Sequence, residues 1–420
     1  MENFRNLGID ESVLRVIKEQ NFSEPTEIQQ KSIPHILKGS DVLGCSATGS
    51  GKTLAFGSGI IQNCDKGRGV QSLVLVPTRE LCEQVYKNLS NFSKYKNLLV
   101  IPVYGGVGIG PQIQAIPRAD VVVGTPGRIL DHLDRKTINL NNVKILVLDE
   151  ADQMFDMGFI QDVEKIIRYC PRNRQTMLFS ATLNSEVSRL ASKHMRNPVS
   201  VTAVQNVDPS KLSQCYYDVD DSTKFSLLVH LLKQEHEGVV MIFCNSRRAV
   251  DFVNKNLRAN GIESTAVHGG FSQHKRNNAI EKFHAGKIFV LVCTDVAARG
   301  LDIKGVSHVY NYDIPKDSKQ YIHRIGRTAR AGEEGKAISI LGQRDHDSFR
   351  RVLRENSVKI RREELPQFEK VVIRVEPRTQ GFRGNRFGQR SGFRGQGNRG
   401  VQQRDWLGSP RRHHHGYNRR

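Results

Sequence analysis

A twice-repeated alternation of short apolar runs with longer amphipathic stretches constrains the fold of this chain more than any other feature. Up to about residue 203 the apolar runs are nearly continuous, and stretches between them, such as 79–93 and 184–194, have helical spacing. Apolar strands separated by helices are typical of a parallel sheet that helices cover on both faces. The strands expected in this part are 42–45, 72–76, 98–104, 121–123, 145–148 and 176–179.

The alternation pauses near Asn197-Pro198, where we expect a linker with an edge strand, and then resumes. Residues 73–79 and 241–247 are alike, because each reads as a strand followed by a hydroxyl residue and an arginine at a helix start. This similarity indicates a duplicated α/β fold. The strands expected in the second half are 239–243, 264–267, 288–292, 308–312 and 337–341.

Charge and composition set the C-terminal segment apart. The chain carries 63 lysines and arginines against 43 acids, a net charge of +20, which suggests a polyanionic partner such as nucleic acid. Residues 377–420 hold eleven arginines, one acid and almost no aliphatic side chains, so we expect them to be disordered. The expected organisation is a first domain over 1–203, a linker over 204–212, a second domain over 213–365 and a disordered tail over 366–420.

Several classes of protein are disfavoured by the same sequence. The apolar runs are only a few residues long, whereas a membrane-spanning helix needs about 20. The N-terminus lacks an apolar signal core, and none of the seven cysteines forms a Cys-x-x-Cys pair. We therefore expect a cytoplasmic protein with reduced thiols and no membrane partner. The run His413–His415 is too short to be assigned as a zinc site.

A phosphate site is predicted where the first apolar strand ends. Residues 42–53 read as a strand, a glycine-containing loop and a helix start, although Ser46 stands where the strict motif has glycine. In such a loop the backbone N–H groups turn toward phosphate, the lysine reaches the β- and γ-phosphates, and the hydroxyl of the next residue binds Mg²⁺. The alternative is a flexible turn. The residues expected to form the site are Ala47, Thr48, Gly49, Ser50, Gly51, Lys52 and Thr53.

Two acids follow another apolar strand about 100 residues later. Asp149 and Glu150 come directly after 145–148, which places them at the carboxyl edge of a parallel sheet, where ligands of α/β folds bind. We expect Asp149 to hold Mg²⁺ through water and Glu150 to orient or deprotonate the attacking water. The alternative is that these acids cap the following helix.

The sequence 149–152, Asp-Glu-Ala-Asp, resembles the signature of the DEAD-box RNA helicases. Further segments resemble motifs of that family, in its order and with similar spacing from about residue 4 to residue 345. Small departures, such as Asn21, Cys82 and Ala329, remove no catalytic group. The matching segments are 77–81, 105–106, 125–128, 180–182, 242–245, 273–276, 294–302 and 323–330. The resemblance implies two tandem RecA-like domains and an RNA-dependent ATPase that uses ATP and Mg²⁺.

The resemblance also assigns roles around the nucleotide. Gln29 would select adenine and Phe4 would stack on it, although packing in the core is an equal alternative for Phe4. Asp302 would contact the ribose. Arg327 and Arg330 would act as arginine fingers that neutralise charge on the γ-phosphate. Because the fingers belong to the second domain, a complete site would form only when the two domains close on ATP.

RNA would bind across both domains through the phosphate backbone, and therefore without sequence preference. Closure would bend one strand and open a few base pairs. Asp152, Ser180, Thr182 and His323 would couple the two sites, with Ser180 and Thr182 bonded to Asp152. The implied RNA-binding residues are Pro77, Thr78, Arg79, Gly106, Thr125, Arg128, Arg276, Thr294 and Arg299.

The arginines of the tail alternate with glycine and with aromatic residues, which resembles RGG-type RNA-binding segments. We expect the tail to bind RNA and to reach ribonucleoprotein partners, with a merely solubilising tail as the alternative. The protein is expected to be a monomer. Two other functions stay open on the sequence alone, a DNA helicase and an RNA clamp or annealing chaperone that does not unwind.

Overall fold

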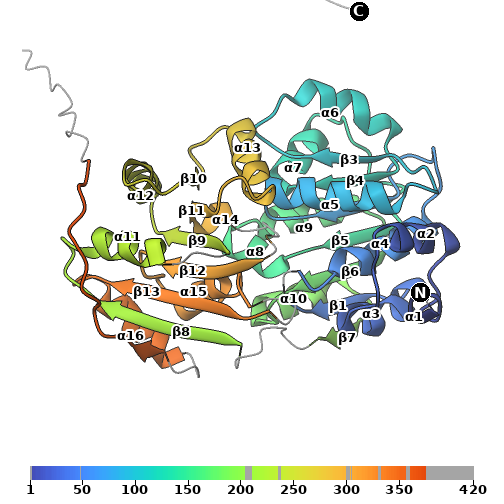
Figure 1. Cartoon of the computed structure of the whole chain (residues 1–420). Coiled ribbons are helices and arrows are strands. Elements are labelled where there is room, and N and C mark those ends of the chain that lie inside the picture. Colours follow the sequence, from blue (N-terminus) through green and yellow to red (C-terminus); the bar gives the residue numbers. More distant parts are fainter. Residues whose placement is uncertain are drawn as a thin grey trace, which may run out of the picture. The chain divides into compact units, whose positions relative to one another are not determined.

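A computed structural model of the chain describes residues 2–47, 49–203, 211–234, 238–298, 303, 305–329, 333–355 and 360–374. Most of the described residues belong to two α/β lobes, the first over 2–203 and the second over 211–374 (Figure 1). No helix in the described part of the chain is both long enough and apolar enough to cross a lipid bilayer.

The first lobe contains a seven-stranded sheet in the order β3-β4-β2-β5-β6-β1-β7, in which every neighbouring pair is parallel. Its strands are β1 (Val42–Cys45), β2 (Ser72–Leu75), β3 (Val100–Val103), β4 (Val121–Gly124), β5 (Ile145–Leu148), β6 (Gln175–Ser180) and β7 (Val199–Thr202). Its helices are α1 (Glu2–Arg5), α2 (Glu11–Glu19), α3 (Glu27–Leu37), α4 (Lys52–Asn63), α5 (Arg79–Phe92), α6 (Ile109–Ala115), η1 (Ile116–Arg118), α7 (Pro126–Asp134), α8 (Ala151–Asp156), α9 (Ile160–Tyr169) and α10 (Ser185–His194).

The second lobe repeats this architecture with the strand order β10-β11-β9-β12-β13-β8-β14, again parallel throughout. Its strands are β8 (Leu212–Asp218), β9 (Val239–Cys244), β10 (Ser264–Val267), β11 (Val290–Thr294), β12 (Val306–Asn311), β13 (Gly335–Leu341) and β14 (Arg361–Arg362). Its helices are α11 (Lys224–Gln234), α12 (Arg247–Ala259), α13 (Gln273–His284), α14 (Asp295–Ala298), α15 (Ser318–Ile325) and α16 (His346–Glu355).

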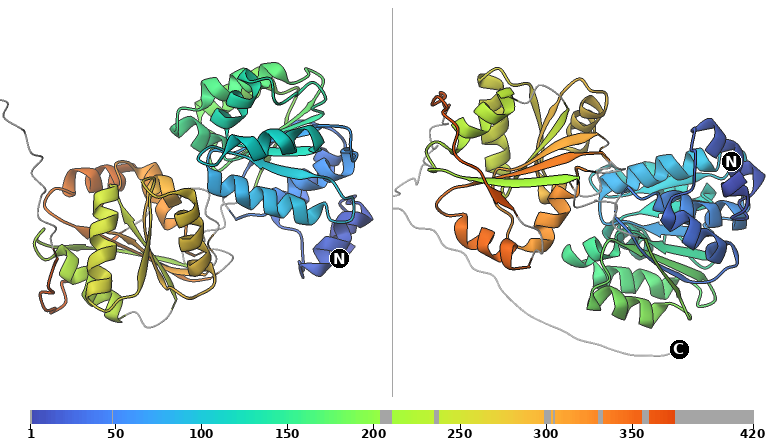
Figure 2. Two further views of the ribbon diagram at one scale, coloured as in Figure 1. Left: turned by 90° about the horizontal axis from the view of Figure 1, so that it is seen from above. Right: turned by 60° about the horizontal axis from the view of Figure 1, so that its bottom comes forward.

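Alternate residues of each central strand enter apolar clusters on opposite faces of its sheet. In β5, for example, Ile145 and Val147 pack into one cluster while Leu146 and Leu148 pack into another. Helices cover both faces of each sheet (Figure 2). Burial on both faces explains why the central strands are nearly continuous apolar runs, and the expected strands match the observed ones within two residues at each end.

The similarity between 73–79 and 241–247 has a structural reason. In both lobes a central strand is followed by a hydroxyl residue that caps the next helix. Thr78 Oγ1 accepts from the backbone N–H of Leu81 at 3.2 Å, and Ser246 Oγ accepts from that of Ala249 at 3.1 Å. A hydroxyl at this position satisfies one of the unpaired donors at a helix start. The two lobes therefore share this helix N-cap as well as a strand topology.

The second lobe extends beyond the expected boundary at residue 365. Backbone N–H groups of Val371 and Arg374 donate to Ser226 Oγ at 3.2 Å and Asn256 Oδ1 at 2.7 Å. Phe368, Val371 and Ile373 also pack against the apolar cluster under α11 and α12. Residues 366–374 are thus part of the lobe, which corrects the start of the tail. Residues 375–420 lie outside the described part of the chain.

Candidate nucleotide and RNA site

The phosphate loop connects β1 to α4 at the carboxyl edge of the first sheet. Gly51 is the N-cap of α4 and has a φ of 89°, where L side chains are strained. A Cβ atom there would also overlap the Gln29 amide, so glycine is required. Lys52 is buried at the helix start, and its Nζ donates to the Ser46 carbonyl at 3.3 Å. Thr53 lies half-buried in the same turn, and Thr48 lies outside the described residues.

Gln29 is tied to this loop from α3. Its Oε1 accepts from the backbone N–H of Thr26 at 3.0 Å, and its Nε2 donates to the Gly51 carbonyl at 3.0 Å. Thr26 Oγ1 donates to the Ser50 carbonyl at 2.7 Å. A glutamine amide has a second N–H and a second lone pair, so these contacts leave one donor and one acceptor of Gln29 over.

Phe4 is buried in the first lobe. Its side chain is fully buried in the apolar cluster formed by the first helices and the sheet. An aromatic ring can stack on a base only with an exposed face. This burial favours core packing, the alternative that the sequence left open for Phe4.

Asp149 and Glu150 follow β5 and are both buried. Asp149 Oδ1 lies 4.0 Å from Lys52 Nζ and accepts from the backbone N–H of Glu150 at 3.0 Å. Glu150 has a φ of 54°, in the left-handed region that residues other than glycine uncommonly adopt. Burial raises the pKa of Asp149, and it raises the pKa of Glu150 to about 7 although Lys52 opposes the shift. The site thus holds two buried, poorly solvated acids close to Lys52.

The coupling residues form a short bridge beyond β6. Thr182 donates to Asp152 Oδ2 from its backbone N–H at 3.2 Å and from Oγ1 at 3.1 Å. Ser180 Oγ donates to the Thr182 carbonyl at 2.8 Å. The expectation that both hydroxyl residues bond Asp152 therefore needs correction, because Ser180 supports Thr182 instead.

The expected RNA residues of the first lobe follow the three strands on the other half of the same edge. Pro77, Thr78 and Arg79 come after β2, Gly106 comes after β3, and Thr125 and Arg128 come after β4. A Cβ atom at Gly106, which has a φ of 83°, would overlap the Arg79 guanidinium. Strand order therefore divides the edge between β2 and β5, with the RNA set on one half and the phosphate loop, acids and coupling residues on the other.

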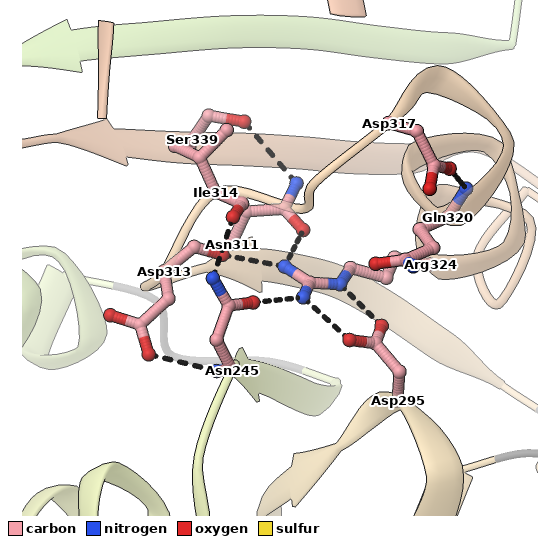
Figure 3. A network of polar contacts seen from close by, with 9 residues as sticks. All are labelled: Asn245, Asp295, Asn311, Asp313, Ile314, Asp317, Gln320, Arg324 and Ser339. Atoms are coloured by element: carbon pink, nitrogen blue, oxygen red, sulfur yellow. Dashed lines mark hydrogen bonds and ion pairs between the residues drawn. The ribbon is translucent and has the colours of Figure 1, made fainter. Parts of the chain in front are cut away.

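In the second lobe the carboxyl edge is organised by Arg324, whose side chain is only 1% exposed (Figure 3). Its Nε and Nη2 donate to the two oxygens of Asp295 at 2.6 and 2.7 Å. Nη2 also donates to Asn245 Oδ1 at 2.7 Å, and Nη1 donates to the Asp313 carbonyl at 2.5 Å and to Asn311 Oδ1 at 3.3 Å. The network holds α15, which carries His323, against the ends of β9, β11 and β12.

Arg324 and Asp295 both lie within predicted motif segments, but the sequence alone does not predict a role for either residue. Their positions could have indicated a role, because Arg324 directly follows His323 and Asp295 directly follows Thr294, and His323 and Thr294 are both predicted site residues. Arg327 is buried just after α15, His323 and Thr294 are half-buried, and Arg276 Nη2 bonds Glu80 Oε1 at 2.9 Å. Arg299, Asp302 and Arg330 lie outside the described residues.

Comparisons with known proteins agree on one family. Residues 26–190 match the DEAD/DEAH box helicase model, and residues 223–332 match the helicase conserved C-terminal domain. The chain is 41% identical over 375 residues to the DEAD-box ATP-dependent RNA helicase CshA of Bacillus cereus, covering 89% of this chain and 71% of that protein. It is 43% identical over 362 residues to the ATP-dependent RNA helicase CshA of Listeria monocytogenes, covering 86% and 69%.

Solved structures resemble the same two lobes. Dbp5 of Saccharomyces cerevisiae bound to RNA and ADP BeF3 has a TM-score of 0.78 and 31% identity, covering 86% of this chain and 96% of that one. A DEAD box protein from Methanococcus jannaschii has a TM-score of 0.53 and 40% identity, covering 86% and 99%. With its two RecA-like lobes and both family models matched in order, the chain belongs to the DEAD-box ATP-dependent RNA helicases, enzymes that hydrolyse ATP in the presence of RNA.

Proposed function

We propose that this protein binds RNA without sequence preference and uses ATP-driven closure of its lobes to open short duplexes or to remodel RNA–protein complexes. The observation that carries the proposal is the division of one sheet edge in the first lobe into adjoining nucleotide and RNA halves. A relative with the same fold, Dbp5, is bound to RNA and to ADP BeF3 at once, which supports simultaneous use of both halves.

On the nucleotide half, each residue has a role that its chemistry suits. Lys52 binds the β- and γ-phosphates, and Glu150 orients or deprotonates the attacking water. Gln29 binds the adenine edge through the donor and acceptor that its contacts with Thr26 and Gly51 leave over. The backbone of 47–51 surrounds the phosphates.

Magnesium fits the same residues. The Thr53 hydroxyl and the Asp149 carboxylate are oxygen ligands of the kind that Mg²⁺ prefers, and Mg²⁺ binds through few protein groups and several waters. Asp149 is buried 4.0 Å from Lys52 Nζ, and a cation beside it would further offset the cost of its charge. When bound, Mg²⁺ would neutralise charge on the phosphates.

The second lobe supplies the remaining positive charge. Arg327 and Arg330 stabilise the γ-phosphate in the transition state, Asp302 contacts the ribose, and His323 helps to couple this site to RNA. Arg276, Thr294 and Arg299 extend the RNA site. Because hydrolysis then requires groups from both lobes, ATP binding favours closure and product release favours opening.

The bridge from Asp152 to Thr182 supports coupling within the first lobe. Asp152 lies two residues after Glu150, and its carboxylate holds the segment after β6 through Thr182. A change in the position of Glu150 on nucleotide binding would therefore pass along the backbone to Asp152, and from Asp152 to this segment through its hydrogen bonds with Thr182.

The substrate class is tested by measuring ATP turnover with RNA and with DNA of equal length, and by a strand-displacement assay beside an annealing assay. We expect stimulation by RNA and ATP-dependent displacement of short duplexes. Equal stimulation by DNA would favour a DNA helicase. Annealing without displacement would favour a clamp or chaperone.

The tail is proposed to add RNA affinity and to recruit ribonucleoprotein partners to a monomeric enzyme. Deleting residues 377–420, which carry eleven arginines, should weaken RNA binding and reduce its dependence on salt, while ATP turnover at saturating RNA stays the same. Unchanged affinity at low salt would instead indicate a solubilising tail.

A further inference from the structure

We propose that a cavity at the amino end of the first sheet binds a small phosphorylated molecule. The cavity has a volume of about 550 Å³ and lies between the loops that precede β2, β5 and β6. It is therefore at the opposite end of the strands from the nucleotide and RNA residues, which follow the carboxyl ends.

The strongest indication is Arg174, which lines the cavity and is only 7% exposed. Its Nη1 donates to the Pro171 carbonyl at 2.8 Å, but its Nε is buried without a hydrogen-bond partner among the described residues. Burial lowers the pKa of Arg174, because its charge is poorly solvated. A buried guanidinium normally has an anionic partner.

The nearby acid Asp41 does not meet this need. One of its oxygens accepts from the backbone N–H of Thr176 at 2.8 Å, and the other accepts from that of Arg196 at 2.6 Å. Asp41 attracts Arg174 electrostatically, yet no ion pair joins the two side chains in the described part of the chain. An anion in the cavity would place a negative charge beside the guanidinium of Arg174, which lines it.

The rest of the wall suits phosphate. Arg68 and Lys144 add two exposed cations, and Asp65, which lies 3.6 Å from Lys144 Nζ, is the single carboxylate of the lining. Asn141, Asn142 and Asn173 contribute amide groups that can donate to phosphate oxygens. Arginine and amide donors converging on a concave site are typical of the recognition of small anionic ligands.

The loops around the cavity are held in place without a ligand. The Gln71 side chain accepts from the backbone N–H of Asp65 at 3.1 Å and donates to its carbonyl at 2.6 Å. Asp120 accepts from the backbone N–H of Gly67 at 2.7 Å, and Asn142 Nδ2 donates to the Arg68 carbonyl at 3.4 Å. A preformed site loses less entropy when it binds. The volume also falls within the range of small-molecule pockets.

The test is a calorimetric titration of the full chain with inorganic pyrophosphate. ADP and a single-stranded RNA are present in excess, so that the nucleotide site and the basic surfaces are already occupied. The test variant is Arg68→Gln with Lys144→Gln, which removes two exposed charges from the wall. The matched control, Lys66→Gln with Arg168→Gln, removes two exposed charges that do not line the cavity. Arg174→Gln is measured as well, with circular dichroism to check its fold.

We expect the wild type and the control to bind pyrophosphate alike, and the Arg68/Lys144 variant to bind at least about ten-fold more weakly, since even one lost charge-assisted contact accounts for about that factor. Equal affinity in the test variant and the control would overturn the proposal. Binding that appears only when RNA is omitted would also overturn it, because the pocket would then hold the RNA backbone.

Discussion

Two groups of buried charges lie at the carboxyl ends of the two sheets, and they differ in how well the protein satisfies them. Arg324 in the second lobe donates to two carboxylate oxygens, two side-chain amides and a backbone carbonyl (Figure 3). Lys52 in the first lobe donates to one carbonyl at 3.3 Å and lies 4.0 Å from Asp149.

The difference distinguishes a buried charge that stabilises the fold from buried charges that are placed to meet a ligand. A buried charge with all its partners in place fixes the elements that it joins, and Arg324 joins α15 to three strand ends. The buried acids around Lys52 instead carry a desolvation cost, and such costs are common in sites for charged substrates. Removing the charge of Arg324 should therefore lower the free energy of unfolding. Removing the charge of a buried acid near Lys52 should leave it level or raise it.

The largest expected effect is on turnover. Lys52→Ala should reduce RNA-stimulated ATP hydrolysis by about 10³-fold, because it removes a preorganised charge that faces the phosphates. A steady-state ATPase assay at saturating RNA measures it. Lys66→Ala, which alters an exposed lysine outside the phosphate loop, is the control and should turn over normally. Full turnover in Lys52→Ala would contradict the assignment of the site.

The next effect is on stability. Arg324→Met should lower the free energy of unfolding by about 3–5 kcal/mol, because the half-buried Asp295 and the buried Asn311 would lose their cationic partner. Urea denaturation measures the change. Arg350→Met, at a side chain that is 70% exposed, should stay within about 0.5 kcal/mol of the wild type. Similar losses in both variants would remove the distinction between a structural network and a surface charge.

A smaller effect depends on pH. The pKa of Glu150 is raised from 4.5 to about 7 in the folded protein, so the cost of its charge is present above pH 7 and disappears below about pH 4.5. Glu150→Gln should therefore be more stable than the wild type at pH 8 by about 1–3 kcal/mol, and this difference should shrink toward pH 5. Denaturation curves at both pH values measure it, and a constant difference would indicate another cause.

The smallest effect concerns coupling. Thr182→Val removes a hydroxyl that donates to Asp152 and should reduce RNA stimulation of ATP turnover about five-fold, since a single hydrogen bond contributes about 1 kcal/mol. Unstimulated hydrolysis should change less. Thr202→Val on the edge strand β7 serves as the control. Equal loss of stimulated and unstimulated turnover would mean that the bridge serves hydrolysis alone.

Features that follow from local sequence rules could be predicted, whereas features that depend on contacts between distant residues could not. The strands, the phosphate loop and the two acids follow local rules, because doubly buried strands are apolar and Gly51 must adopt a positive φ. The sequence does not predict strand β8, Leu-Ser-Gln-Cys-Tyr-Tyr-Asp, because its apolar and polar residues do not alternate regularly. Residues 366–374 were assigned to the tail because their hydrogen bonds join them to distant helices.

Other features depend on packing that a sequence does not display. Phe4 has the spacing expected of a stacking residue, but its burial depends on how α1 packs against the lobe. The five donations of Arg324 link residues separated by up to 79 positions, and the cavity around Arg174 is formed by three loops that are distant in the chain. Contacts of this range become visible only in the folded protein.

One preparation of Glu150→Gln at pH 8 tests the central contrast most directly, with RNA-stimulated ATP turnover and the free energy of unfolding both measured. If the buried acids of the first lobe serve the nucleotide at the expense of the fold, turnover should be lost while the free energy of unfolding stays level or rises. Preserved turnover, or a fall in stability comparable to that of Arg324→Met, would contradict this account.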